Sequence, residues 1–511
     1  MERTTRRSFL QSSALGASGM MGVAAAPSAA EPGGREPGSQ GPGAKATYEF
    51  RRSLPIEDGF DLVVAGGGPA GTAAAVCAAR LGAKVVLLEA MGCLGGMGTS
   101  GLVTAFDPMA NGERMLVGGL MREIVTTMHR RGFLAPHVTA DFYSKRFHCW
   151  TPFKAEGYKL VLDELVKAAG VDVRFFTRAI DADVDPDTRT VHGVIAHNVE
   201  GIRYLRARTF VDATGDGVLA HVCGVPCREA GRDTPNIMPP TLCSVFAGID
   251  WERANPSPHA TGPANQQALL EKAIADGHFS HRDRHMPGLF KVGHSLGMVN
   301  AGHIFHMDAL RCRSLSDGVM RGRELAREYL AFFRKYVPGC ENVELAATGS
   351  LVGVRESRRI VGEYELNFDD YLARRKFPDQ IAVFNKAVDI HVYDDSDEEY
   401  ERYHSEYTKT GRLKPGEYFG IPYGILVPRG WRNLWVAGRC NSSDVRVHGS
   451  IRVQPAASMM GQAVGTASVQ SLAAGQPACD LDTAQLVETL RQNGAYLPQQ
   501  ELTKTMTRAN A

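Results

Sequence analysis

The chain of 511 residues carries 57 lysines and arginines against 56 aspartates and glutamates, which leaves a formal net charge of +1. This balance argues against a nucleic-acid partner, because such proteins usually present a strongly basic surface. Hydrophobic residues make up 44% and charged residues 22%, as in a globular rather than a disordered protein. The 10 cysteines are too few for a disulfide scaffold. At roughly 100–200 residues per domain, the length allows several structural units.

The first 30 residues have the order of an export signal. Residues 6–10 read Arg-Arg-Ser-Phe-Leu, and residues 14–26 form a weakly hydrophobic stretch that is shorter than the ~20 residues of a membrane span. A small-residue cleavage pattern follows at 28–30. We therefore expect residues 1–30 to be a twin-arginine signal peptide, carried by the twin-arginine translocase to the periplasm or the extracellular space. No other segment approaches the length of a membrane span.

A dinucleotide-binding pattern begins the folded part of the chain. An apolar run over 61–65 predicts a buried strand, and a Gly-x-Gly-x-x-Gly turn, a small-residue helix over 72–81 and a second strand over 84–89 follow. Such a turn lets the backbone approach a pyrophosphate at the helix N-terminus. Glu89 ends the second strand, where a carboxylate accepts hydrogen bonds from ribose hydroxyls. The predicted phosphate-binding residues are Gly66, Gly68, Pro69, Ala70 and Gly71.

Later glycine-rich segments favour FAD over a nicotinamide cofactor. The loop 92–99, the strand and Ala-Thr-Gly motif at 209–217, and the strand ending in glycine at 433–440 resemble elements of glutathione-reductase-like FAD enzymes. The helix entered through 447–455 resembles the one that meets the flavin pyrimidine edge in that class. The resemblance implies further FAD-binding residues, namely Gly95, Gly96, Met97, Thr99, Ile180, Asp212, Thr214, Gly215, Gly438 and Arg439.

A narrower resemblance covers about residues 60–472. The elements at 94–99, 156–159, 212–217 and 353–362, with the His-Gly-Ser-Ile-Arg-Val-x-Pro stretch, are similar to those of the bacterial FAD-dependent oxidoreductase family. The resemblance implies an α/β fold: a glutathione-reductase-like Rossmann FAD domain with an interleaved α+β substrate domain. The family is catalytically diverse, so the resemblance names no substrate.

These expectations divide the chain into segments. The Pro/Gly-rich stretch after the signal peptide predicts a flexible linker. The body returns to its FAD domain near the C-terminus, after the substrate domain. The predicted segments are the signal peptide at 1–30, the linker at 31–46, the FAD domain at 60–220 and 431–475, the substrate domain at 221–430, and a C-terminal helix and tail at 476–511.

Some chemistry is absent or left open by the sequence. No second strand–GxGxxG–helix unit exists, so we expect no domain for a nicotinamide nucleotide. The electron partner would then be oxygen, a quinone or a small redox protein. Cys223 and Cys227 could form a disulfide or remain thiols, and Cys93 could carry a covalent flavin. His294, His303 and His306 form a loose cluster with Asp308 that lacks a compact ligand motif, so we predict no metal site.

The catalytic residues are the boldest prediction. His448 and Arg452 lie four apart just before the predicted flavin-facing helix, and their stretch resembles the HGxxR stretch of fumarate-reductase-like flavoproteins. In this hypothesis Arg452 binds flavin or an anionic substrate, and His448 moves a proton near neutral pH. Arg355 would face them from the other domain. The alternative is that His448 and Arg452 only brace the loop and the helix start.

Together these patterns predict an exported FAD-dependent oxidoreductase. It would transfer a hydride between a small polar or anionic substrate and the flavin N5. Two other classes stay open at this stage: a non-redox flavoprotein such as a lyase, hydratase or isomerase, and an exported carbohydrate-binding protein with a vestigial flavin site.

Overall fold

The computed structural model describes residues 48–255, 263–406 and 411–498. The chain divides into two compact units, Met1–Ser53 and Leu54–Ala511. In the first unit the described residues 48–53 are exposed and form neither helix nor strand. The predicted signal peptide and linker lie outside the described residues. All elements named below belong to the second unit.

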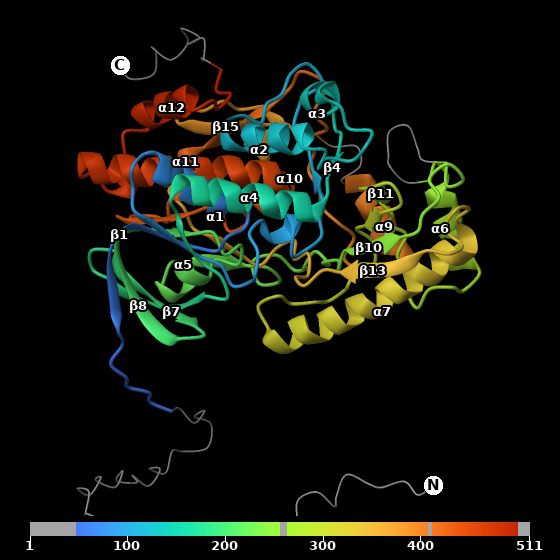
Figure 1. Cartoon of the computed structure of the whole chain (residues 1–511), viewed down its shortest axis with the longest axis horizontal. Coiled ribbons are helices and arrows are strands. Elements are labelled where there is room, and N and C mark those ends of the chain that lie inside the picture. Colours follow the sequence, from blue (N-terminus) through green and yellow to red (C-terminus); the bar gives the residue numbers. More distant parts are fainter. Residues whose placement is uncertain (1–47, 256–262, 407–410, 499–511) are drawn as a thin grey trace, which may run out of the picture. The chain divides into compact units, whose positions relative to one another are not determined.

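The larger sheet has seven strands and includes both strands of the predicted dinucleotide-binding pattern (Figure 1). Its strand order is β5-β2-β1-β8-β7-β6, and β17 also pairs with β8. The pairs among β5, β2, β1, β8 and β17 are all parallel, whereas β7 pairs antiparallel with both β8 and β6. The strands are β1 (Ile56–Ala65), β2 (Val85–Leu88), β5 (Asp172–Arg174), β6 (Arg178–Asp185), β7 (Thr190–Asn198), β8 (Gly201–Asp212) and β17 (Leu434–Val436). This Rossmann-like parallel sheet confirms the predicted α/β fold class.

Both faces of the parallel strands are covered, which explains their continuous apolar runs. In β1, Leu62 and Val64 pack into one hydrophobic core, and Val63 and Ala65 pack into another. The first core holds the helices α1 (Pro69–Arg80), α2 (Gly119–Arg130), α4 (Ala155–Ala169) and α11 (Gln454–Ala474). Figure 1 shows α2, α4 and α11 running side by side.

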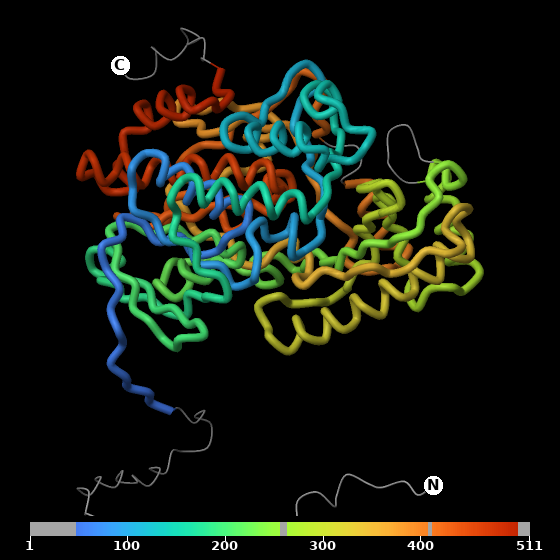
Figure 2. Tube along the Cα trace, in the orientation of Figure 1, coloured from blue at the N-terminus to red at the C-terminus, as the bar shows by residue number. Residues whose placement is uncertain are grey.

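The contact between α1 and α11 joins two distant parts of the sequence (Figure 2). It depends on small residues. A Cβ at Gly461 would lie 2.0 Å from the Ala70 carbonyl oxygen, and a Cβ at Gly465 would lie 2.3 Å from that of Ala74. Only glycine therefore allows the two helices to pack this closely. Through this contact, the start of α11 is held near the start of α1.

A second, antiparallel sheet has the order β11-β12-β10-β13. The long helix α7 (Cys312–Tyr336) packs on it, with Phe333 edge-on to Phe246 (Figure 1). The strands of this sheet are β10 (Ser244–Ala247), β11 (Leu289–Lys291), β12 (Gly297–Val299) and β13 (Glu344–Thr348). The predicted division into an FAD domain and a substrate domain stays a prediction, although the two sheets fall in the expected segments.

The remaining elements lie outside these two sheets. β3 pairs with β4, β9 with β14, and β15 with β16. These strands are β3 (Ala105–Phe106), β4 (Thr151–Pro152), β9 (Cys227–Glu229), β14 (Arg358–Ile360), β15 (Gln380–Phe384) and β16 (Phe419–Pro422). The helices are α3 (Ala140–Lys145), α5 (Val218–Val222), α6 (Gln266–Ala275), α8 (Phe368–Leu372), α9 (Asp397–Glu406), α10 (Val445–Ile451) and α12 (Thr483–Gln492). Short 3₁₀ turns are η1 (Gly96–Gly98), η2 (Tyr423–Leu426) and η3 (Ala478–Asp480).

Two further features of the fold are the state of the cysteines and the character of the helices. All the cysteines lie within the described residues and are free, so Cys223 and Cys227 are thiols. Within the described ranges, no helix combines the length and the apolar character that crossing a bilayer requires.

Candidate active site

The turn between β1 and α1 has the shape of a phosphate cradle. A Cβ at Gly66 would lie 2.5 Å from the Ala213 carbonyl oxygen, and one at Gly71 would lie 1.7 Å from that of Gly66, so both positions need glycine. A Cβ at Gly68 would meet no atom within 4 Å. The open space lies at the N-terminus of α1, where Pro69 is the first helical residue and no side chain caps the helix. The free N–H groups and the helix dipole there suit a pyrophosphate.

Glu89 stands beside this turn, directly after β2. Its carboxylate accepts hydrogen bonds from the backbone N–H of Gly67 at 2.6 Å and of Met91 at 2.7 Å. Burial raises the pKa of Glu89, and the backbone N–H groups oppose that rise only in part. Each carboxylate oxygen has two lone pairs, so acceptor capacity remains for ribose hydroxyls.

The second glycine-rich loop packs against the first. Gly95 has φ +96° and Gly96 has φ +48°, and a Cβ at Gly96 would lie 3.1 Å from the Cα of Gly68. Thr99 Oγ1 donates to the Leu94 carbonyl at 2.6 Å, which fixes the turn around Met97. The structure thus brings the residues of both predicted phosphate-binding loops together.

The other predicted FAD residues surround the same edge of the sheet. Gly438 follows β17, and a Cβ there would lie 3.3 Å from that of Ala70. Arg439 donates to Asp216 at 2.6 Å and to Ser357 Oγ at 2.7 Å. A Cβ at Gly215 would lie 3.2 Å from Nη2 of Arg439.

Asp212 and Ile180 occupy contrasting environments. Asp212 is fully buried, and its carboxylate accepts from the N–H and Oγ1 of Thr214 and from the N–H of Ala220, so it braces the start of α5. Ile180 lies on β6 and is 43% exposed, unusual for a large apolar side chain. A direct contact of either residue with FAD stays a prediction.

The three predicted catalytic residues do come together, although Arg355 is distant in sequence. His448, in α10, lies with its Nε2 3.2 Å from the Arg355 carbonyl oxygen. Arg355 is 6% exposed and donates its Nε–H to the Pro239 carbonyl, while its Nη2 has no partner among the described residues. Arg452 donates its Nη2–H to the Asp389 carbonyl at 2.9 Å, and its Nε likewise lacks a partner.

Burial and the nearby positive charges lower the pKa values of residues in this group. Burial lowers the pKa of Arg355 to about 10, and the nearby Arg452 adds to the shift. Burial, together with the charges of Arg359 and Arg452, holds the pKa of His448 well below its ordinary value. His448 is therefore neutral at physiological pH, which does not favour its predicted proton transfer near neutrality.

The segment that follows β15 also contributes charged residues, which were not predicted from the sequence. Lys386 Nζ lies 2.6 Å from Asp107 Oδ2, and the Asp389 carboxylate lies 3.5 Å from Arg452 and 3.3 Å from His391. Burial would raise the pKa of Asp389, but the charges of Lys386, His391 and Arg452 bring it well below its ordinary value. The signal was the presence of charged residues inside the otherwise apolar run 380–393.

Known proteins resemble this chain to different extents. The model of the family described as FAD dependent oxidoreductase matches residues 61–490. Dihydrolipoyl dehydrogenase of Trypanosoma brucei brucei is 53% identical over 47 residues, which are 9% of this chain and 10% of that protein. The chain thus matches only a tenth of the length of this relative.

Solved structures give a more distant likeness. A geranylgeranyl bacteriochlorophyll reductase-like protein from Thermoplasma acidophilum is 13% identical, with a TM-score of 0.41 over 86% of this chain and 84% of that one. L-proline dehydrogenase from P. horikoshii is 14% identical, with a TM-score of 0.39 over 86% and 99%. Similarity at this level carries no argument about a substrate.

Proposed function

We propose, since the chain belongs to the FAD dependent oxidoreductase family, that it transfers a hydride between a small anionic substrate and flavin N5. Family membership bears out FAD as the cofactor and an FAD-dependent oxidoreductase as the enzyme class, as the sequence predicted. Bound FAD supplies the hydride chemistry at N5. The substrate, the electron partner and the export route belong to the proposal.

The residues around the β1–α1 turn are the proposed FAD holders. The open space at Gly68 and the uncapped start of α1 would receive the pyrophosphate, and Glu89 would accept from the ribose. Gly438 and Arg439 border the same region from the return segment. The residues present therefore fit the cofactor.

The substrate proposal rests on two arginines, each of which has a buried N–H group without a partner among the described residues. A buried N–H without an acceptor costs about 1–3 kcal/mol, more on a charged group. Arg355 Nη2 and Arg452 Nε are both in this condition. A guanidinium fork matches a carboxylate, so an anionic substrate would satisfy both groups at once.

His448 is proposed as a positioning residue rather than a proton carrier. Its Nε2 faces the Arg355 carbonyl, and its neutral state suits a hydrogen bond donated to that oxygen. It would thereby fix the backbone from which the Arg355 guanidinium extends. In this proposal His448 has the bracing role and Arg452 has the substrate-binding role, which were the two alternatives that the sequence left open.

The direct test is anaerobic mixing of the holoprotein with matched pairs of small molecules. Hydroxy acids, amino acids and other carboxylates should include a donor that bleaches the flavin, while its methyl ester or amide should react at least ~100-fold more slowly. A neutral analogue that reacts equally fast would contradict anion recognition. A holoprotein that no carboxylate reduces, but neutral sugars or amines do, would contradict it too.

The electron partner is proposed to be oxygen, a quinone or a small redox protein. This rests on the single strand–GxGxxG–helix unit in the sequence, at residues 61–81, which the proposed FAD site uses. NADH and NADPH should therefore reduce the flavin slowly. Rapid stoichiometric bleaching by NADPH in a stopped-flow experiment would contradict this part of the proposal.

Export by the twin-arginine translocase is proposed from the signal pattern at residues 1–30. Changing Arg6→Lys together with Arg7→Lys should leave the precursor in the cytoplasm. The matched control Arg35→Lys, in the predicted linker, should not affect export. Unchanged export of the Arg6/Arg7 variant would contradict export by the twin-arginine translocase.

A further inference from the structure

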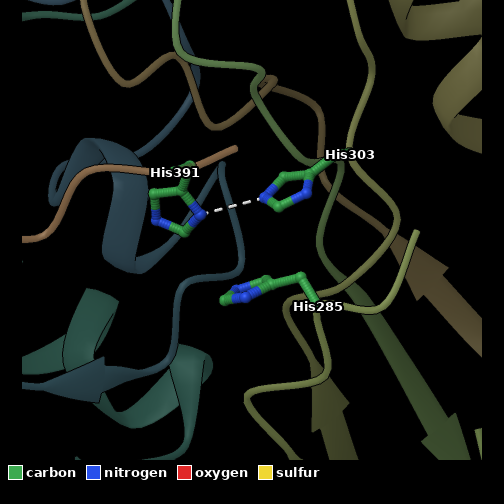
Figure 3. A group of neighbouring side chains, drawn as sticks. All are labelled: His285, His303 and His391. Atoms are coloured by element: carbon green, nitrogen blue, oxygen red, sulfur yellow. Dashed lines mark hydrogen bonds between the residues drawn. The ribbon is translucent and has the colours of Figure 1, made fainter. Parts of the chain in front are cut away.

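Three histidines from separate loops meet inside the second unit (Figure 3). His285 precedes β11, His303 lies between β12 and α7, and His391 follows β15. One ring nitrogen from each lies within 4.8 Å of the others. His303 and His391 are 2% and 5% exposed, and His285 is partly exposed. Neither the cofactor nor the arginine pair of the proposed function uses these rings.

Carboxylates lie behind two of the rings. His303 Nδ1 is hydrogen-bonded to Asp283 Oδ1 at 3.1 Å, whereas His391 Nε2 lies 3.3 Å from Asp389 Oδ1 without a hydrogen bond among the described residues. Because a carboxylate accepts, Nδ1 of His303 is assigned the N–H. Nε2 is therefore the nitrogen through which His303 would bind a metal ion. This is how proteins hold histidines that bind metals, since the carboxylate fixes the tautomer and the orientation.

The two inner nitrogens face each other. His303 Nε2 and His391 Nδ1 lie 2.9 Å apart and share a hydrogen bond, drawn as a dashed line in Figure 3. One proton therefore lies between the two nitrogens, in the place that a metal ion would take. In a tetrahedral zinc site with Zn–N distances of about 2.0–2.1 Å, ligand nitrogens are about 3.3 Å apart. A small separation of the two rings would therefore admit a metal ion.

His285 is placed to complete the set. Its ring stacks on His303 at a centroid distance of 4.7 Å and meets His391 edge-on at 4.8 Å. Within the described residues its ring nitrogens make no hydrogen bond, while its backbone N–H is held by Asp283 at 3.0 Å. Its ring now turns a face toward His303, so binding requires a rotation about its side-chain bonds that no hydrogen bond opposes.

Asp283 supports the same conclusion. Its carboxylate is 1% exposed, and both of its ion-pair partners in the described chain are histidines, His281 at 3.9 Å and His303 at 3.1 Å. Tyr400 and two backbone N–H groups complete its hydrogen bonds. A buried carboxylate is rarely retained without a compensating cation, and a metal ion on His303 would supply one.

We infer that His285, His303 and His391 bind one divalent transition-metal ion. Neutral imidazoles favour Zn²⁺, Cu²⁺ or Ni²⁺ over Mg²⁺ or Ca²⁺. Three protein ligands leave a fourth position open. Around the three rings, the carboxylates of Asp107, Asp283 and Asp389 face the cationic side chains of Arg355, Lys386 and Arg452. The ion would leave the cluster cationic, so an anionic fourth ligand is favoured.

The test uses the full-length holoprotein, purified with a tag that contains no histidine. After treatment with a chelator and its removal, Zn²⁺ is titrated in competition with a chromophoric chelator, and FAD content is read from the flavin spectrum. Wild-type protein should bind one Zn²⁺ per chain. His303→Ala and His391→Ala should each weaken binding at least ~100-fold, and Asp283→Asn ~10–100-fold. His192→Ala, an exposed position in β7, is the matched control and should bind like wild type.

Failure of this inference is distinct from failure of the proposed function, because FAD content is measured on the same samples. If wild-type protein binds no stoichiometric Zn²⁺, Cu²⁺ or Ni²⁺, the inference is wrong and the 2.9 Å contact holds a proton. Equal affinity in wild type and in the His303→Ala/His391→Ala double variant would overturn it as well. Should the variants fold poorly, the titration of wild type still decides, and His303→Gln repeats the comparison with a polar side chain.

Discussion

The nucleotide-binding turn and the arginine–histidine cluster are built in opposite ways. The turn lies within one strand–turn–helix–strand stretch, residues 56–89, and its residues lie near each other in the chain. The cluster gathers single residues from loops around 285, 303, 355, 389 and 452. The turn depends on glycines at positions where a Cβ would clash with the backbone. The cluster depends on buried charges of opposite sign that compensate each other. The residues proposed to bind the cofactor are therefore close together in the sequence, whereas those of the proposed substrate and metal sites meet only in the folded chain.

The largest effect should come from the two glycines of the turn, which have opposite surroundings. Gly71→Ala places a Cβ 1.7 Å from a backbone oxygen, and overpacking of this kind costs about 1–3 kcal/mol or more. Gly68→Ala meets nothing within 4 Å and has φ −66°, which alanine adopts freely. Urea unfolding should show a large loss of stability for Gly71→Ala only, whereas Gly68→Ala should fold but bind FAD weakly.

Equal stability of these two variants would contradict the packing that we describe at the turn. Full FAD content in Gly68→Ala would show that the open space at this position is not where the pyrophosphate binds. The two tests are independent, because stability is measured by urea unfolding and FAD content by the flavin spectrum.

The next effect concerns the cluster. Arg452→Ala should keep the fold and the flavin but lower the rate of flavin reduction by at least ~100-fold, because it removes a buried guanidinium proposed to bind the substrate. Arg446→Ala, exposed on the neighbouring helix α10, is the matched control and should be nearly silent. Stopped-flow reduction by the carboxylate found in the substrate screen measures both. Near-wild-type rates in Arg452→Ala would remove this residue from the proposed site.

Much of the first region was predictable, because its constraints act over a few residues. Gly66, Gly71 and Glu89 lie where the motif predicts. Arg439 was predicted from resemblance, but its pairing with Asp216 and Ser357 was not, since it depends on a strand that returns late in the chain.

The cluster could be predicted only in part. His448 and Arg452 belong to one short motif, so both could be predicted from the sequence. His285, His303 and His391 have no spacing that a sequence motif would show, and their convergence follows from loops at the ends of three different strands. The sequence therefore predicted no metal site at the place where we now propose one.

A moderate effect is expected at Glu89. Glu89→Ala removes a carboxylate that holds two backbone N–H groups and would hold the ribose, at roughly 1.5–3 kcal/mol per charged hydrogen bond. FAD affinity, measured by titration of apoprotein, should fall at least ~10-fold, while the exposed Glu123→Ala control should not change it. Since burial raises the pKa of Glu89, wild-type affinity should begin to fall at a higher pH than for an ordinary glutamate (about 4.3). Affinity unchanged by Glu89→Ala would contradict its role.

The smallest expected effect is a difference in thiol labelling between the holoprotein and the apoprotein. This experiment needs no substitution and tests whether FAD covers the second glycine-rich loop. Cys93 lies in the second glycine-rich loop, is partly exposed, and has its Sγ 3.2 Å from Ser100 Oγ. FAD bound across this loop should slow its reaction with a maleimide several-fold relative to apoprotein. Cys312, exposed at the start of α7, should react at the same rate in both forms and serves as the internal control. Cys223 should stay unreactive in both, because burial raises its pKa to about 12 and the thiolate is the reacting species. Peptide mapping by mass spectrometry separates the three sites. Equal labelling of Cys93 with and without FAD would place the cofactor away from this loop, and the two glycine-rich loops would then not bind FAD together.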